Sequence, residues 1–156
     1  MAELTHFDPE GRPSMVDVGD KPVTAREATA QGRITMSAEA RAALIAGRGP
    51  KGDARTVAQL AGVQAAKDTA RLIPLCHILP LDKVAVEIEP EGETGFHVTA
   101  RVRATAKTGV EMEALTAVSV ACLTLYDMGK ALDKAMTIHG IALGATSGGR
   151  SGDYRK

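Results

Sequence analysis

The sequence predicts an α+β fold: a ferredoxin-like antiparallel sheet with helices packed on one face. Two segments, 83–89 and 96–104, alternate apolar and polar residues, and the turn-forming run 91–95 joins them as a hairpin. Helical patterns precede and follow this hairpin, and extended segments begin and end the series. A chain of 156 residues is long enough for one such domain and leaves little room for two.

The N-terminal part of the chain begins without periodicity. Residues 1–20 mix acidic residues, prolines and glycines, which predicts a flexible N-terminal arm. Residues 23–36 are rich in polar and β-branched types and predict an extended segment, in which Gly32 would mark a break. A single α+β domain is therefore expected over 21–146.

Two helices are predicted after this extended segment. Ser37 is a suitable N-cap for a helix over 38–46, and Asp53 is a suitable N-cap for a second helix over 54–73. Pro74 ends the second helix, because proline lacks an N–H group and restricts the residue before it. The segment 74–80, with a proline at each end, is expected to be short and rigid.

A long helix is predicted after the hairpin. Thr108 and Glu111 have the spacing of a capping box, and apolar residues then recur every three or four positions to about Leu132. Residues 136–146 predict a final strand. The Gly-rich, basic segment 147–156 is expected to be a flexible tail.

Composition argues against several classes of protein. The chain has 19 basic and 19 acidic residues, so it is neither a globally basic nucleic-acid binder nor a polybasic membrane protein. Only 3% of its residues are aromatic, too few for a base-stacking surface. No apolar run approaches the roughly 20 residues of a membrane span, and the N-terminus lacks the apolar core of a signal peptide. We therefore expect a cytoplasmic protein with no nucleic-acid or membrane partner.

Common nucleotide and metal motifs are missing from the sequence. It has no G-x-x-x-x-G-K-[ST] loop, no G-x-G-x-x-G after a strand and no H-E-x-x-H. Cys76 and Cys122 form no C-x-x-C pair, so each is expected to be a reduced thiol among apolar residues. The sequence therefore predicts no metal site.

Two loop residues are candidates for chemistry. Lys51 lies in a Gly-Pro-Lys-Gly turn before a helix, where backbone N–H groups and positive charge suit a phosphate. The alternative is a solvated loop lysine. His77 lies in the apolar strip between two prolines and could act as an acid, a base or a hydrogen-bond donor in a cleft. The alternative is a half-buried histidine whose hydrogen bonds are satisfied.

The long helix carries further candidates. Asp127 and Lys130 are three residues apart and face alike, so they are either an acid–base pair or a surface ion pair. Glu111 is either a capping partner or a site residue. Glu113 and Asp127 are 14 residues apart, which is roughly 21 Å along a straight helix. If both serve one small substrate, a second subunit must close the gap.

Three long motifs in this chain resemble the MoaC family. They are Leu-Cys-His-Ile-Leu-Pro-Leu at 75–81, Thr-Gly-Val-Glu-Met-Glu-Ala-Leu-Thr at 108–116 and Tyr-Asp-Met-Gly-Lys at 126–130. The resemblance extends from Leu-Thr-His at 4–6 to Ser-Gly-Gly at 147–149. The one departure is Arg150, which stands where a lysine is common and keeps the positive charge.

The resemblance implies an enzyme of molybdenum cofactor biosynthesis. Such an enzyme rearranges 3′,8-cyclo-7,8-dihydro-GTP to cyclic pyranopterin monophosphate and releases pyrophosphate. The family's fold is ferredoxin-like. Its assembly is a homohexamer, a trimer of dimers, with active sites between subunits.

The same resemblance implies which residues form the site. The catalytic residues would be Asp127, Lys51 and Lys130, which serve acid–base catalysis and phosphate binding. The substrate pocket would be lined by Leu75, Cys76, His77, Glu111, Met112 and Glu113. Arg26 is a further candidate, because a triphosphate of about four negative charges needs local cations. No redox cofactor is required, since the reaction is a rearrangement with elimination, and Mg²⁺ would enter only with the triphosphate.

Two other functions remain open at this point. The chain could be a non-catalytic binding or assembly module on the same fold, in which case Lys51, Asp127 and Lys130 would be dispensable. It could also be a phosphate-handling enzyme such as a nucleotide cyclohydrolase. The lack of metal-ligand spacing to activate water disfavours the cyclohydrolase.

Overall fold

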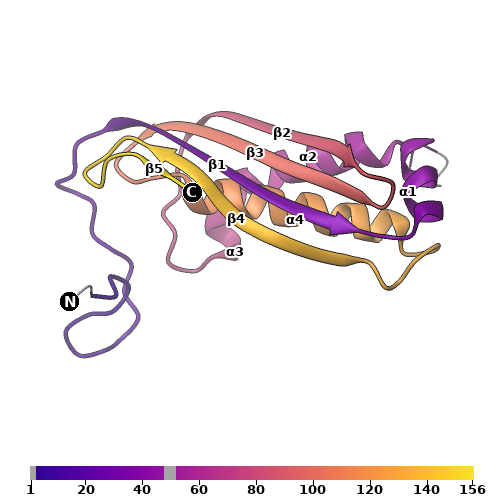
Figure 1. Ribbon diagram of the computed structural model, residues 1–156. Helices are drawn as coiled ribbons and strands as arrows, with labels where there is room; N and C mark the ends of the chain where they lie inside the picture. Colours follow the sequence, from indigo (N-terminus) through magenta and orange to yellow (C-terminus); the bar gives the residue numbers. More distant parts are fainter. Residues whose placement is uncertain (1–2, 48–51) are drawn as a thin grey trace.

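The computed structural model describes residues 3–47 and 52–156 and contains one antiparallel sheet with helices on one of its faces (Figure 1). Along the chain the elements are β1 (Thr24–Thr35), α1 (Ala38–Ile45), α2 (Ala54–Lys67), α3 (Thr69–Leu72), β2 (Leu81–Glu91), β3 (Gly95–Ala106), α4 (Glu111–Gly129), β4 (Thr137–Ser147) and β5 (Tyr154–Arg155). The strand order across the sheet is β2-β3-β1-β4-β5.

This topology confirms the predicted fold class. The order of the first four strands and the main helices is β-α-β-β-α-β, and all neighbouring strands in the sheet are antiparallel. That is the ferredoxin-like pattern. The hairpin β2–β3 was predicted correctly as a unit, and both strands are longer than the sequence pattern indicated.

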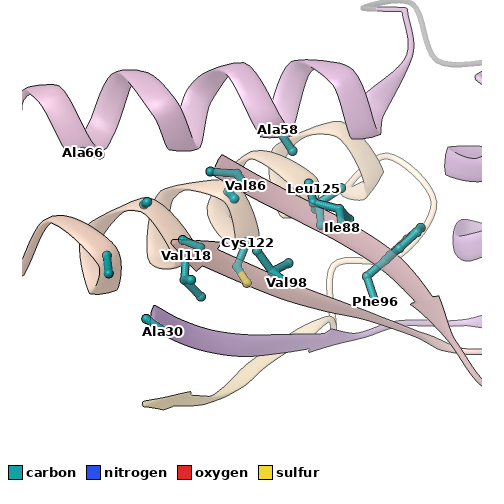
Figure 2. Close-up of a cluster of buried hydrophobic side chains, with 14 of the residues drawn as sticks. Ala30, Ala58, Ala66, Val86, Ile88, Phe96, Val98, Val118, Cys122 and Leu125 are labelled. Carbon is teal, nitrogen blue, oxygen red and sulfur yellow. The ribbon is translucent and has the colours of Figure 1, made fainter. Parts of the chain in front are cut away.

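The core lies between the sheet and the helices α2 and α4, as Figure 2 shows. Alternate residues of β3 face this layer, beginning with Phe96 and Val98, which are fully buried. They meet Val118, Cys122 and Leu125 of α4, which are also fully buried. Because successive side chains of a strand point to opposite faces, the other half of each strand faces away from the helices.

Small residues let α2 approach both α4 and the sheet. Gly62 of α2 lies so close to its neighbours that an added Cβ would be 3.1 Å from the carbonyl oxygen of Ala117 and 3.0 Å from a methyl of Val86. Ala58 and Ala66 of the same helix are also buried (Figure 2). The close approach buries apolar area with small side chains, which lose little conformational entropy on folding.

The expected break at Gly32 is wrong, because β1 is continuous from Thr24 to Thr35. Gly32 serves packing instead: a Cβ at this position would lie 2.7 Å from a methyl of Val118. Beside Gly32 the strand is irregular only in its pairing: the register between β1 and β4 shifts between Gln31 and Arg33. Glycine is required here by the close approach of α4 to the strand.

The helix starts agree with the predicted caps in two cases and differ in one. The side chain of Ser37 accepts a hydrogen bond from the backbone N–H of Ala40, and that of Asp53 accepts one from Arg55. The predicted capping box of Thr108 and Glu111 is wrong, because the residue before α4 is Val110, with no side-chain cap. Gly109 is a poor helix former and Val110 is buried in the core, so the helix begins at Glu111.

Two predicted helix ends also differ. The helix expected over 54–73 is interrupted at Asp68, giving α2 and the short α3. The long helix stops at Gly129, three residues before Leu132, and Lys130 follows it as the C-cap.

Both terminal segments contact the domain. In the tail, β5 pairs with β4, and the backbone N–H of Lys156 donates to the carbonyl of Gly144. The composition of the tail did not predict this strand. In the arm, the carbonyl of Gly19 accepts a hydrogen bond from the Lys107 ammonium at 2.9 Å. Figure 1 shows the arm leaving the start of β1 and folding back on itself near the N-terminus.

Candidate active site at the first turn of α4

One small pocket brings together six of the seven residues predicted to bind substrate. It has a volume of about 190 Å³ and is lined by His6, Leu75, Cys76, His77, Leu79, Thr108, Gly109, Glu111, Met112 and Glu113. Segment 74–80 forms one side and the start of α4 forms the other. The two motifs, about 30 residues apart in the sequence, therefore meet at a single place.

The positions of these motifs follow from the local structure. Between α3 and β2 the chain runs without regular structure, and Pro74 and Pro80 bound this segment. Its backbone is held at one point by a hydrogen bond from the N–H of Cys76 to the carbonyl of Ile73. The segment thus presents consecutive side chains toward the N-terminus of α4, where the first-turn acids are placed favourably for the helix dipole.

Glu113 is the most unusual group of the pocket. Its residue surface is only 4% exposed, in contrast to most glutamates, which lie at protein surfaces. Its pKa is raised from 4.5 to about 7, mainly by burial and to a smaller extent by the charge of Glu111, against the opposing hydrogen bond from its own backbone N–H. Near neutral pH this carboxyl group can therefore both donate and accept a proton, as an acid–base site requires.

Cys76 lies in the same pocket as a protonated thiol. Burial raises its pKa, and the nearby carboxylate of Glu113 adds to that effect. A raised pKa reduces the fraction of thiolate, the nucleophilic form. Cys76 is therefore suited to shaping the pocket and to weak hydrogen bonding rather than to covalent catalysis.

His77 uses one ring nitrogen for a structural contact. Its Nε2 atom is 2.8 Å from the carbonyl oxygen of Val16 in the N-terminal arm. A carbonyl oxygen can only accept, so this nitrogen carries the hydrogen and donates it. When the imidazole is neutral, its Nδ1 atom is then the acceptor that could face a ligand.

Arg26 is the one predicted binding residue that does not line the pocket. It lies near the start of β1, and its Nη2 atom donates to the carbonyl of Lys107 at 3.3 Å. Lys107 directly precedes Thr108, which lines the pocket, so Arg26 belongs to the same end of the molecule. Its Nε atom is buried without a hydrogen-bond partner in the described structure.

The predicted catalytic pair lies at the opposite end of α4. The Lys130 ammonium is 2.7 Å from a carboxylate oxygen of Asp127, and the two side chains are 54% and 43% exposed. The hydrogen bond to Asp127 and the charge of its carboxylate raise the pKa of Lys130. Lys51, the third predicted catalytic residue, lies outside the described residues.

The two groups of predicted residues do not meet within one chain. Fourteen residues of continuous helix separate Glu113 from Asp127, a rise of roughly 21 Å. The pocket at the first turn is also small. Its volume of about 190 Å³ is below the roughly 300–1,000 Å³ of a usual ligand pocket. A single chain therefore does not bring Asp127 and Lys130 to the pocket beside Glu113.

Several residues that line the pocket were not among the predicted site residues. Leu79, Thr108 and Gly109 line it within or beside the recognised motifs, and their positions there could have suggested them. His6 is different, because it comes from the arm, whose lack of periodicity indicated only mobility. The Leu-Thr-His start of the resemblance was the only signal for it.

The outer face of the sheet contains a separate hollow of about 470 Å³. Its polar lining includes Gln31, Lys83, Glu87, Thr99 and Arg101, and none of the predicted site residues is among its lining. The helices cover the other face, so this polar face is open in a single chain (Figure 1).

The described residues contain neither a cluster of metal-ligating side chains nor a membrane-spanning helix. Across residues 3–47 and 52–156, no group of three or more His, Cys, Asp or Glu side chains is placed to hold a metal ion. Among the helices in those same ranges, none has the length and apolar character needed to cross a membrane.

Comparison with known proteins gives a consistent result. A model of the MoaC family matches residues 15–149. A protein of Nostoc sp. named cyclic pyranopterin monophosphate synthase is 56% identical over 154 residues, which are 98% of this chain and 92% of that protein. Proteins of the same name from Chloroflexus aurantiacus and Cereibacter sphaeroides are 55% and 57% identical over 155 residues, 99% of this chain and 95% and 98% of theirs.

The matched segment includes both ends of α4, the pocket segment 74–80 and nearly all of the sheet. Because the family model covers most of the chain and the relatives are more than half identical over almost all of it, this chain belongs to the MoaC family.

Proposed function

We propose that this protein is a cyclic pyranopterin monophosphate synthase of molybdenum cofactor biosynthesis. It converts 3′,8-cyclo-7,8-dihydro-GTP to cyclic pyranopterin monophosphate and pyrophosphate. The observation that carries the proposal is the convergence of the 75–77 and 111–113 residues on one pocket, in a chain whose relatives bear this name. The enzyme is a lyase, because its net change is the loss of pyrophosphate.

The pocket at the first turn of α4 suits the fused-ring part of this substrate. Leu75 and Met112 offer apolar surface to the rings, and the carboxyl groups of Glu111 and Glu113 can accept hydrogen bonds from ring N–H and amino groups. Opening one ring and closing another moves protons among nitrogen, carbon and oxygen. A carboxyl group with a pKa of about 7 can exchange such protons in both directions.

The other end of α4 suits the phosphate chemistry. The cyclic phosphate forms when a sugar hydroxyl attacks the α-phosphorus and pyrophosphate leaves, so the hydroxyl must lose a proton and the leaving group needs cations nearby. Asp127 can accept the proton, and Lys130 and Lys51 can stabilise the developing negative charge. Arg26 would contribute a further cation from the pocket end. We propose these roles on the chemistry of the side chains and the family motifs.

The active site is proposed to form between subunits of a homohexamer, a trimer of dimers. Three observations support a shared site: the pair Asp127–Lys130 is exposed, it is roughly 21 Å from Glu113, and the pocket beside Glu113 is smaller than a usual ligand site. The open polar face of the sheet offers a surface for contact between copies. A partner placed with twofold symmetry would bring the last turn of its α4 to the first turn of this one.

The chemistry in this scheme comes from the chain's own acids, bases and cations. A rearrangement with elimination needs no redox cofactor, and Mg²⁺ would arrive with the triphosphate as part of the substrate. That the protein is located in the cytoplasm remains a prediction from the sequence.

A direct turnover assay tests the proposal. Purified protein is incubated with 3′,8-cyclo-7,8-dihydro-GTP, and pyrophosphate and the cyclic pterin are measured together. We expect equal amounts of the two products from the native chain and neither from Lys51→Ala. A folded, oligomeric native protein that releases neither product would contradict the proposed enzyme and favour a binding module.

A further inference from the structure

The N-terminal arm reaches the pocket, and we propose that its residue His6 is a further substrate-binding residue. The inference rests on the proposed function and extends it to a segment that the sequence predicted to be a flexible N-terminal arm. Among the residues that the structure describes, His6 is the only one that lines this pocket and precedes β1, and so the only one from the described part of the arm. The same pocket is lined by several titratable side chains, which are Cys76, His77, Glu111 and Glu113.

His6 opens a loop that is closed by its own hydrogen bonds. The carbonyl of His6 accepts a hydrogen bond from the N–H of Ser14 at 2.9 Å, and Phe7 forms a β-bridge with Pro13. Inside the loop, a carboxylate oxygen of Asp8 accepts from the backbone N–H of Arg12 at 2.8 Å. These contacts restrict the backbone that carries the imidazole, so its position at the pocket costs less entropy than in a free tail.

Two side chains from outside the arm fasten it beside the pocket. His77 donates from Nε2 to the carbonyl of Val16 at 2.8 Å, and Lys107 donates from Nζ to the carbonyl of Gly19 at 2.9 Å. His77 itself lines the pocket, and Lys107 is next to Thr108, which also does. The arm is thus held at two points, one by a residue of the pocket and one by a neighbour of such a residue in the sequence. Lys107 acts in this scheme as a positioning residue.

The chemistry of the pocket indicates which part of the substrate His6 contacts. Glu111 and Glu113 place carboxyl groups in the same pocket, and carboxylates repel a triphosphate. The fused rings carry carbonyl, N–H and amino groups, and a neutral imidazole can donate to the carbonyl or accept from an N–H or amino group. The geometry therefore assigns His6 to the ring end of the substrate.

A comparison of two neighbouring arm residues tests the contact. His6→Ala should raise KM about tenfold and leave kcat within about twofold, as expected for the loss of one ground-state hydrogen bond. Phe7→Ala is the matched control: its side chain is 52% exposed, it is not among the pocket residues, and its bridge to Pro13 is made by the backbone. We expect this control to keep both constants, and His6→Asn to recover part of the lost affinity.

A double-mutant cycle tests the fastening of the arm. Lys107→Met removes the ammonium that holds Gly19 but leaves the backbone carbonyl that accepts from Arg26. This change should also raise KM. In its background the rise in KM caused by His6→Ala should be smaller than the about tenfold expected in the native chain, because the arm, then held by His77 alone, positions the imidazole less firmly. Independent, multiplying effects would show that Lys107 does not position His6.

The outcomes separate this inference from the proposed function. If the native chain does not turn over, the proposed function fails and this inference fails with it. If the native chain turns over, and His6→Ala matches it or Phe7→Ala shows the same rise in KM, only the inference is overturned. A fall in kcat with no rise in KM would overturn it as well. Thermal unfolding of each variant shows whether the exposed arm has affected the fold.

Discussion

The first and last turns of α4 both carry predicted site residues, but in opposite environments. At the first turn, Glu113 is 4% exposed and its pKa is raised to about 7. At the last turn, Asp127 and Lys130 form an ion pair that is about half exposed. A buried ionisable group changes the free energy of unfolding in proportion to the shift in its pKa, whereas an exposed ion pair contributes little to that free energy. Function and stability should thus be coupled at the first turn and separable at the last.

The largest expected effect is on activity at the last turn. Lys130→Met removes the cation and proton donor, and we expect kcat/KM to fall by at least about 100-fold, the lower range for loss of an acid–base group. The unfolding midpoint should barely change. Lys134→Met is the control, since the contact of Lys134 with Tyr126 uses its backbone carbonyl. A Lys130→Met enzyme that keeps most of its kcat/KM would remove the last turn from the active site.

The next largest effect comes from mixing two inactive variants. Glu113→Gln damages the first turn and Lys130→Met the last turn, so a shared site in a mixed dimer can receive both intact groups. Random mixing in equal amounts gives half mixed dimers with one intact site of two, or about a quarter of native activity. The measurement is turnover after co-expression of the two chains. If activity stays at the level of the separate variants, each site is built from a single chain.

The third prediction concerns stability at the first turn. The carboxyl of Glu113 has a higher pKa in the folded chain than the ordinary 4.5, so the folded state holds its proton more tightly. The free energy of unfolding should therefore fall as pH rises from about 4.5 to above 7, by on the order of 3 kcal/mol. Urea unfolding across this range measures the slope. Glu113→Gln, which cannot ionise, should flatten it.

A control for this slope is available elsewhere in the chain. Glu39→Gln alters an exposed acid in the first turn of α1 and should leave the slope unchanged. The pKa values of Asp53 and Glu91 are lowered, by hydrogen bonds from Thr56 and Arg33 respectively, so their contributions are lost only below about pH 4. A slope that persists in Glu113→Gln would place its origin in another group.

The smallest expected effect is the stability contribution of the exposed pair. A double-mutant cycle with Asp127→Asn and Lys130→Met should give a coupling energy below about 0.5 kcal/mol in urea unfolding. The cycle removes whatever else either side chain contributes to the fold. A coupling above about 2 kcal/mol would mean that the last turn, like the first, combines function with stability.

Periodicity predicted the fold well because it depends on alternation that the core enforces. The hairpin and the long helix were predicted from the spacing of apolar residues. Val98, Val118 and Leu125 have that spacing because each faces the core, where all three are buried. The ends of elements were harder. Gly109 and Val110 moved the start of α4 past the predicted capping box, since burial of Val110 in the core outweighed a side-chain cap.

The pocket was only partly predictable for a related reason. Residues 75–77 and 111–113 were proposed from the motifs, and the fold brings them together. His6 could not be found from periodicity, and only the Leu-Thr-His start of the family resemblance indicated it, because the arm is positioned by hydrogen bonds from side chains to its carbonyls. Those contacts use backbone acceptors that every residue type provides, so the sequence carries no signal for them.

The unbroken helix α4 also sets the distance and the relative direction of the two halves of the proposed site. A helix advances by 1.5 Å and turns by about 100° for each residue. Inserting one alanine between Glu113 and Asp127 would therefore rotate the last turn by more than a quarter of a circle while hardly changing its distance. What the number of residues between the two motifs fixes most sharply is the rotation of one motif relative to the other about the helix axis. Lineages of this protein should therefore tolerate substitutions along α4 far better than insertions or deletions.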